Sequence, residues 1–325
     1  MSKTSYYHLD RLVAPGPRLP WIKQWLLAEV WSRENYEKMK PVEFLHRGES
    51  AVNDFEQLLA AAADRTYGEL LAGPDPTKNM LETLSRPDHA VVIFDGLSLR
   101  EIPMVIGLAE KSGLKVSRMD ASLAAVPCET MDFIARELPC GRIAPSQLPG
   151  RKELKEWGIA AVYSGNYTQG IPENHDGSAL LVWSSFPDTT YRDSGAKFDS
   201  HFENIHAMLE TAWMSTVQQI KGKRKIVITS DHGYIFFGAG MDFPRQPAEM
   251  RELNAYFGND RYVFLTEKPA PPASDDVFID SSRQVALIKG RVKTRSTGEA
   301  AAKLYKHGGL SLMEMLTPWI ELEAT

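Results

Sequence analysis

Two stretches, AVVIFDG at residues 90–96 and IVITSDHG at residues 226–233, each lead from an apolar run into an acidic residue and a glycine. Short, continuous apolar runs rich in valine and isoleucine indicate buried strands. A buried strand that carries a carboxylate, or a carboxylate and an imidazole, at its carboxyl end is how an open α/β sheet builds a site. A third stretch, KHGGLS at residues 306–311, adds a histidine followed by two glycines. The three stretches predict an α/β fold and, where they converge, a metal centre.

The sequence around these motifs alternates apolar runs with amphipathic segments, which is typical of a mainly parallel sheet covered by helices on both faces. We therefore expect a three-layer α/β/α fold with a helical N-terminal segment packed on its core. The pattern predicts helices within 19–85, at 131–138 and at 201–220, and a helix start at the capping-box sequence of 311–314. It predicts extended segments at 114–124 and 178–186 and edge strands within 277–292. We expect the chain to divide into 1–86 and 87–325.

Composition narrows the class of protein. The chain has 325 residues, of which 43% are apolar and 24% charged, as in an ordinary globular protein. Its net charge of −5 gives no overall reason to expect a nucleic-acid or membrane partner. No apolar stretch approaches the roughly 20 residues that span a bilayer, and the N-terminus lacks the apolar core of a signal peptide. Only two cysteines occur, Cys128 and Cys140, which excludes a disulfide framework. We expect a cytoplasmic protein whose metal ligands are carboxylates and imidazoles.

Each motif also has an ordinary structural explanation. Asp95 could cap the helix that follows it, since aspartate is favoured at that position. Neighbours on a strand face opposite ways, so Asp231 and His232 reach one ion only if the chain turns, and Gly233 would permit that turn. An aspartate and an imidazole on one ion suit Zn²⁺ or Mn²⁺ better than Ca²⁺. His307 taken alone is typical of a solvated loop.

In this order, the three motifs resemble those of the PglZ domain. That domain is a branch of the alkaline phosphatase superfamily, known from bacterial phage-defence systems of the BREX type and from a response regulator. The resemblance covers residues 88–322, and its strongest anchors are residues 229–233 and 307–318. It implies an alkaline-phosphatase-like domain over residues 87–325 and a centre with two metal ions, usually zinc, with manganese as the other candidate.

The resemblance also implies which residues form that centre. Asp95, Asp231 and His232 would hold one ion, and Asp188 and His307 would hold the other.

The nucleophile that the resemblance implies is a serine or threonine, often within a Pro-x-x-Thr sequence. Residues 127–130 read PCET, so Thr130 is the expected nucleophile. A helix after it would offer N-terminal amides to a phosphate. Thr130 could also cap that helix, and the two roles are compatible.

One position departs from the superfamily pattern. Four residues after Asp188, where the superfamily has a histidine, this chain has Arg192. Asp193 or His201 could replace that histidine, or the second ion is weakly held or absent. Arg192 could itself supply a permanent positive charge to a phosphoryl group.

The function that the resemblance implies is metal-dependent phosphoester hydrolysis, by a phosphodiesterase or phosphatase acting through Thr130, in bacterial anti-phage defence. Its partners would be a phosphoester substrate, such as a nucleotide or nucleic acid, and other defence-system proteins, with no membrane. The alternative is a catalytically weak or inactive phosphatase-like scaffold within a defence complex, which the arginine at position 192 favours.

Overall fold

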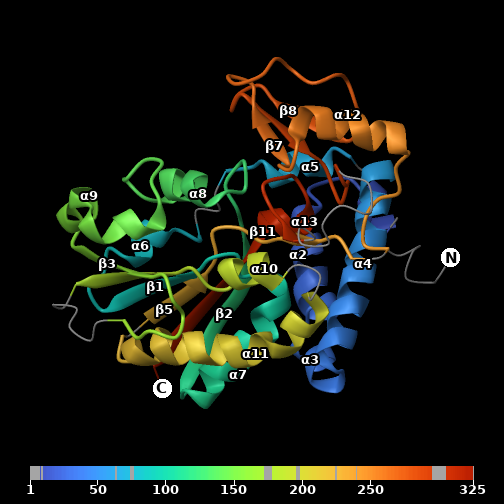
Figure 1. Ribbon diagram of the computed structural model, residues 1–325. Helices are drawn as coiled ribbons and strands as arrows, with labels where there is room; N and C mark the ends of the chain where they lie inside the picture. The colour runs from blue at the N-terminus through green and yellow to red at the C-terminus, as the bar shows by residue number, and fades with distance from the viewer. Residues whose placement is uncertain are drawn as a thin grey trace.

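A six-stranded sheet forms the centre of the molecule (Figure 1), in the strand order β2-β11-β5-β1-β4-β3. The computed structural model describes the chain except for residues 1–7, 9, 63, 74–76, 172–177, 195–197, 224, 239, 295–304 and 325, and for the side chains of 192–194. Four neighbouring strands run parallel: β5 (Lys225–Thr229), β1 (His89–Phe94), β4 (Ala179–Ser184) and β3 (Ile159–Ser164). In contrast, β11 (Leu316–Ala324) is antiparallel to both of its neighbours, β5 and β2 (Leu114–Leu123).

Alternate residues of β1 face two different hydrophobic cores. Val92 and Phe94 belong to a core shared with α2 (Leu19–Trp25), α4 (Pro41–Ala62), α7 (Ile102–Lys111) and α11 (Phe198–Ser215). Val91 and Ile93 belong to a core shared with α6 (Met80–Thr83), α8 (Thr130–Glu137), η3 (Pro145–Gly150) and α9 (Lys152–Glu156). Helices therefore cover both faces of the sheet (Figure 1), and the predicted three-layer fold with a mainly parallel sheet is confirmed.

Shorter elements connect and cover this core. Further helices in the described part of the chain are η1 (Leu26–Val30), α3 (Arg33–Lys38), α5 (Thr66–Leu70), η2 (Leu99–Glu101), α10 (Asp188–Ser194), η5 (Val217–Ile220), α12 (Pro247–Phe257) and α13 (Leu312–Met315). The remaining strands are β6 (Ile235–Phe236) paired with β10 (Tyr305–Lys306), and β7 (Tyr262–Phe264), β9 (Val285–Ile288) and β8 (Val277–Asp280) in a small sheet. Among the described residues, no helix is long and apolar enough to traverse a bilayer.

Three predicted elements differ in part from the structure. Strands do form within 277–292, but in a separate small sheet, in which β9 pairs with β7 on one side and with β8 at the other edge, and which has its own small core with α12. The helix predicted over 201–220 ends at Ser215, and η5 follows as a separate turn. The predicted helix start at Ser311 is correct, since its hydroxyl accepts from the N–H of Glu314. That helix lasts only one turn, because the chain then continues as β11 with strand partners on both sides.

Candidate metal centre

Three aspartates meet at the carboxyl ends of the parallel strands. Asp95 follows β1 directly, and its N–H donates to the carbonyl of Ser184 at the end of β4 over 2.9 Å. The N–H of Asp188 in turn donates to the carbonyl of Asp95, also over 2.9 Å. Asp231 follows β5, the other neighbour of β1. The helix after Asp95 is capped by Ser98, so Asp95 is not the cap that its position in the sequence allowed.

Asp95, Asp231 and His232 form the first donor group. Nε2 of His232 lies 3.6 Å from Oδ1 of Asp95 and 3.6 Å from Oδ2 of Asp231. Nδ1 of His232 is 3.0 Å from the carbonyl of Gly233, so Nδ1 carries the proton and Nε2 presents its lone pair to the carboxylates. Oδ1 of Asp95 and Nε2 of His232 are buried without a hydrogen-bond partner among the described residues. Both atoms present lone pairs and point at one place, which fits a bound cation that would accept both as ligands.

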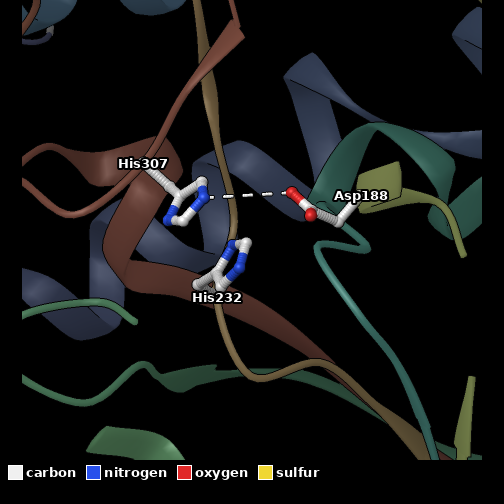
Figure 2. A group of neighbouring side chains, drawn as sticks. All are labelled: Asp188, His232 and His307. Atoms are coloured by element: carbon white, nitrogen blue, oxygen red, sulfur yellow. Dashed lines mark ion pairs between the residues drawn. The ribbon is translucent and has the colours of Figure 1, made fainter. Parts of the chain in front are cut away.

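The second donor group contains Asp188, His307 and again His232 (Figure 2). The two imidazoles stack with their ring centres 3.9 Å apart and an angle of 10° between the rings. Nε2 of His307 lies 3.9 Å from Oδ1 of Asp188, as the dashed line in Figure 2 marks. Nδ1 of His307 lies 3.3 Å from the carbonyl of Cys128 and 3.1 Å from Oε1 of Glu129. His307 therefore also directs Nε2 toward a carboxylate.

The buried carboxylates repel one another. Burial, followed by the charges of Asp231 and Asp188, raises the pKa of Asp95 well above its ordinary value, although Nε1 of Trp183 donates to Oδ2 of Asp95 over 3.1 Å. Burial also raises the pKa of Tyr305 well above its ordinary value, so its hydroxyl stays protonated and donates to Oδ1 of Asp188 over 2.7 Å. A divalent cation at either group would relieve this repulsion.

Thr130 lies at the edge of the first group. Its Oγ1 donates to Oδ2 of Asp231 over 2.6 Å, while Oδ1 of Asp231 accepts from the N–H of Gly96 over 3.1 Å. Thr130 is the first residue of the eight-residue helix α8, and the N-cap is Glu129. The alternative that Thr130 caps the helix is therefore wrong by one residue. The hydroxyl stands beside the unpaired N–H groups that begin any helix.

A close approach between two backbone segments requires a glycine at position 233. A Cβ at this position would lie 2.1 Å from the carbonyl oxygen of Met313, and the N–H of Gly233 donates to the carbonyl of Glu314 over 2.9 Å. The glycine lets the segment after β5 lie directly against α13. By contrast, Gly96 has a φ of +72°, which favours glycine in the turn after β1.

None of the residues considered for the second position, Arg192, Asp193 and His201, is found in a donor group of the described residues. The ring of His201 packs edge-on against Tyr191 with centres 4.8 Å apart, and His201 belongs to neither donor group found among the described residues. Tyr191 stacks on Tyr305, so it occupies the space beside the second group. Arg192 and Asp193 lie in α10, and their side chains are outside the described part of the chain.

The sequence did not reveal every residue that contacts the donor groups. Glu129 directly precedes Thr130 in the sequence, and Tyr305 lies two positions before His307. That proximity was the available signal for each of them. Trp183 gave no signal, because it lies within the apolar run of β4.

No family model matches the chain, and no curated protein matches it in sequence. Among solved structures, similar folds include an inactive form of murine ectonucleotide pyrophosphatase/phosphodiesterase 5 in complex with AMP, at 11% identity and a TM-score of 0.42, over 71% of this chain and 87% of that chain. Another is phosphonoacetate hydrolase from Sinorhizobium meliloti 1021 in complex with phosphonoacetate, at 11% identity and a TM-score of 0.40. The similarity covers 71% of this chain and 89% of that chain. With identities and TM-scores this low, function has to be inferred from the side chains of this chain itself.

Proposed function

We propose that this protein is a metal-dependent phosphoester hydrolase, a phosphodiesterase or phosphatase with Thr130 as its nucleophile. The observation that carries the proposal is the hydroxyl of Thr130 held 2.6 Å from Asp231, a member of the first donor group. The buried atoms Oδ1 of Asp95 and Nε2 of His232, without hydrogen-bond partners among the described residues, support a cation beside that hydroxyl.

The proposed chemistry follows from how Thr130 is held. Its proton points at Oδ2 of Asp231, which leaves the lone pairs of Oγ1 to form the bond to phosphorus. The first N–H groups of α8 would stabilise negative charge on the phosphoryl oxygens. As the bond from Oγ1 to phosphorus forms, the proton of Oγ1 passes by way of Oδ2 of Asp231 to solvent, and the bond from phosphorus to the leaving oxygen breaks. The leaving oxygen takes a proton from water, and a second water later hydrolyses the phosphothreonine, which returns a proton to Oγ1. Divalent cations bound at the two groups would stabilise charge on the attacking and leaving oxygens.

We assign the ligands of the two ions as part of the same proposal. Asp95, Asp231 and His232 would hold one ion, and Asp188 and His307 the other, with zinc or manganese as the metal. Mixed carboxylate and imidazole donors suit both metals. A nucleotide or nucleic-acid substrate, and a place among the proteins of a bacterial anti-phage defence system, extend the proposal through the resemblance of the motifs to the PglZ domain.

The test is hydrolysis of bis(p-nitrophenyl) phosphate by the purified protein with Zn²⁺ or Mn²⁺. We expect turnover that chelation abolishes, and a loss of at least about 10³-fold in Thr130→Val, because the attacking oxygen is gone. Thr130→Ser should retain part of the activity. Thr211→Val, on an exposed position of α11, is the matched control and should keep the wild-type rate.

Three results would count against this proposal. Wild-type turnover in Thr130→Val would reject the nucleophile. Turnover that survives chelation would reject the role of metal. A protein that binds no metal and hydrolyses nothing would favour the scaffold alternative.

A further inference from the structure

We infer that Glu129 is a positioning residue, which fixes the imidazole of His307 so that Nε2 serves the second metal position. This inference rests on the proposed function, because it concerns one of the two proposed ion positions.

The contacts of His307 give the first reason. Oε1 of Glu129 lies 3.1 Å from Nδ1, whereas Nε2 on the opposite side of the ring is the atom nearest Asp188. A carboxylate that accepts from Nδ1 fixes the ring orientation and the tautomer, and it makes the other nitrogen a better ligand. Glu129 is therefore placed to act through His307 rather than on the substrate.

Comparison of the two histidines gives the second reason. Nδ1 of His232 has a carbonyl at 3.0 Å, supplied by the next residue of its own segment. Nδ1 of His307 has a hydrogen bond with the carbonyl of Cys128 at 3.3 Å and, in addition, the carboxylate of Glu129 at 3.1 Å. His232 has its acceptor in its own segment, whereas the carbonyl and the carboxylate beside Nδ1 of His307 both come from residues 128 and 129.

The loop that bears His307 gives the third reason. Gly308 has a φ of +103°, and a Cβ there would lie 2.9 Å from Oε1 of Glu129, so the carboxylate lies directly on the loop. The N–H of Gly308 donates to Sγ of Cys128 over 3.0 Å, which anchors the backbone of the same loop to the same segment. Residues 128 and 129 therefore hold both the backbone and the imidazole at this position.

The test is calorimetric titration of the metal-free protein with Zn²⁺ alone, and separately with Mn²⁺ alone. For Glu129→Ala we expect the dissociation constant of the second equivalent to rise about 10–100-fold, while the first equivalent keeps its wild-type affinity. Glu129→Gln should lose less, because its amide oxygen still accepts from Nδ1 of His307. Glu137→Ala removes a paired glutamate at the last residue of α8, the helix that follows Glu129, and should change neither equivalent.

The outcomes separate this inference from the proposed function. A wild-type protein that binds no metal would refute the proposed function. Suppose that the wild-type protein binds two equivalents of metal. If Glu129→Ala then binds both with wild-type affinity, or binds both more weakly to the same degree, the positioning role alone is refuted. A loss in Glu129→Gln as large as in Glu129→Ala would also refute it, because the carboxylate would then act as a direct ligand.

Discussion

His232 and His307 present the same nitrogen to the centre although they come from distant parts of the chain. Each has Nδ1 engaged by an acceptor outside the donor groups, which leaves Nε2 facing the carboxylates. The stacking of the two rings also means that a change at one histidine reaches the other directly.

Gly233 gives a prediction at the residue scale. Replacing it with alanine would place Cβ 2.1 Å from the carbonyl oxygen of Met313, and backbone atoms cannot rotate away as a side chain can. We expect Gly233→Ala to lower the free energy of unfolding by about 1–3 kcal/mol and to weaken metal binding at His232. Denaturant unfolding and metal titration measure the two effects.

Gly107→Ala is the control for that substitution. A Cβ at Gly107, within α7, would have nothing within 4 Å, so the helix should gain stability by roughly 0.5–1 kcal/mol. An unfolding midpoint for Gly233→Ala equal to that of the wild type would contradict the close approach described above.

At the scale of elements, α4 is joined to the core by buried ion pairs. Glu49 pairs with Arg100, after β1, and with Arg291 over 2.6 Å. Glu56, two turns further along α4, lies 3.3 Å from Arg291 and accepts from the N–H of Leu312 over 2.7 Å. Leu312 begins α13, directly after the loop of His307. Helix α4 therefore supports α13, against which the segment after β5 packs.

Glu56 gives a prediction for the pH dependence of stability. Burial raises its pKa from 4.5 to about 7, although Arg291 and the N–H of Leu312 favour its ionised form. The pKa of Glu56 is higher in the folded protein than in the unfolded chain, so its protonated form stabilises the fold. This stabilisation is complete below pH 4.5 and is lost as the pH rises through about 7. The expected loss is about 3 kcal/mol for this fully buried group. The free energy of unfolding, measured in urea between pH 4.5 and 8, should therefore fall less steeply with pH in Glu56→Gln than in the wild type.

The matched control is Glu252→Gln, at an exposed position of α12. Its stability should follow the wild-type pH profile. If Glu56→Gln and the wild type show the same slope, the raised pKa of Glu56 is refuted.

For the whole molecule, the sequence pattern predicted the features that are encoded locally, which are the buried strands and the acidic residues that follow them. The apolar runs of β1 and β5 identified the buried strands, and the acidic residues after them identified Asp95 and Asp231. The strand β11 was missed, because the capping-box spacing at Ser311 indicated a helix and pairing with distant strands ended it after one turn. Contacts such as that of Glu129 with His307 join segments whose meeting no local pattern encodes.

The division of the chain at residue 86 stays a prediction, and a shortened chain tests it. Without α4, the buried Arg100 and Arg291 lose Glu49, and breaking one buried pair costs about 3–5 kcal/mol of a total stability of about 5–15 kcal/mol. We expect residues 87–325 alone to unfold without a cooperative transition in a calorimeter, whereas the full chain gives one. A cooperative transition at the same temperature in both would show that the N-terminal segment is dispensable for folding.

The position of β11 also bears on how the chain folds. In the described sheet β2 pairs with β11 alone, although most of the chain lies between the two strands. Pairing across so long a separation slows folding, because the loop must close before the contact forms. During synthesis, β2 leaves the ribosome early and waits with its hydrogen-bonding edge exposed until residues 316–324 emerge. Until then β2 has no partner in the described sheet, because β11 lies between β2 and β5, and an unpaired strand edge favours aggregation.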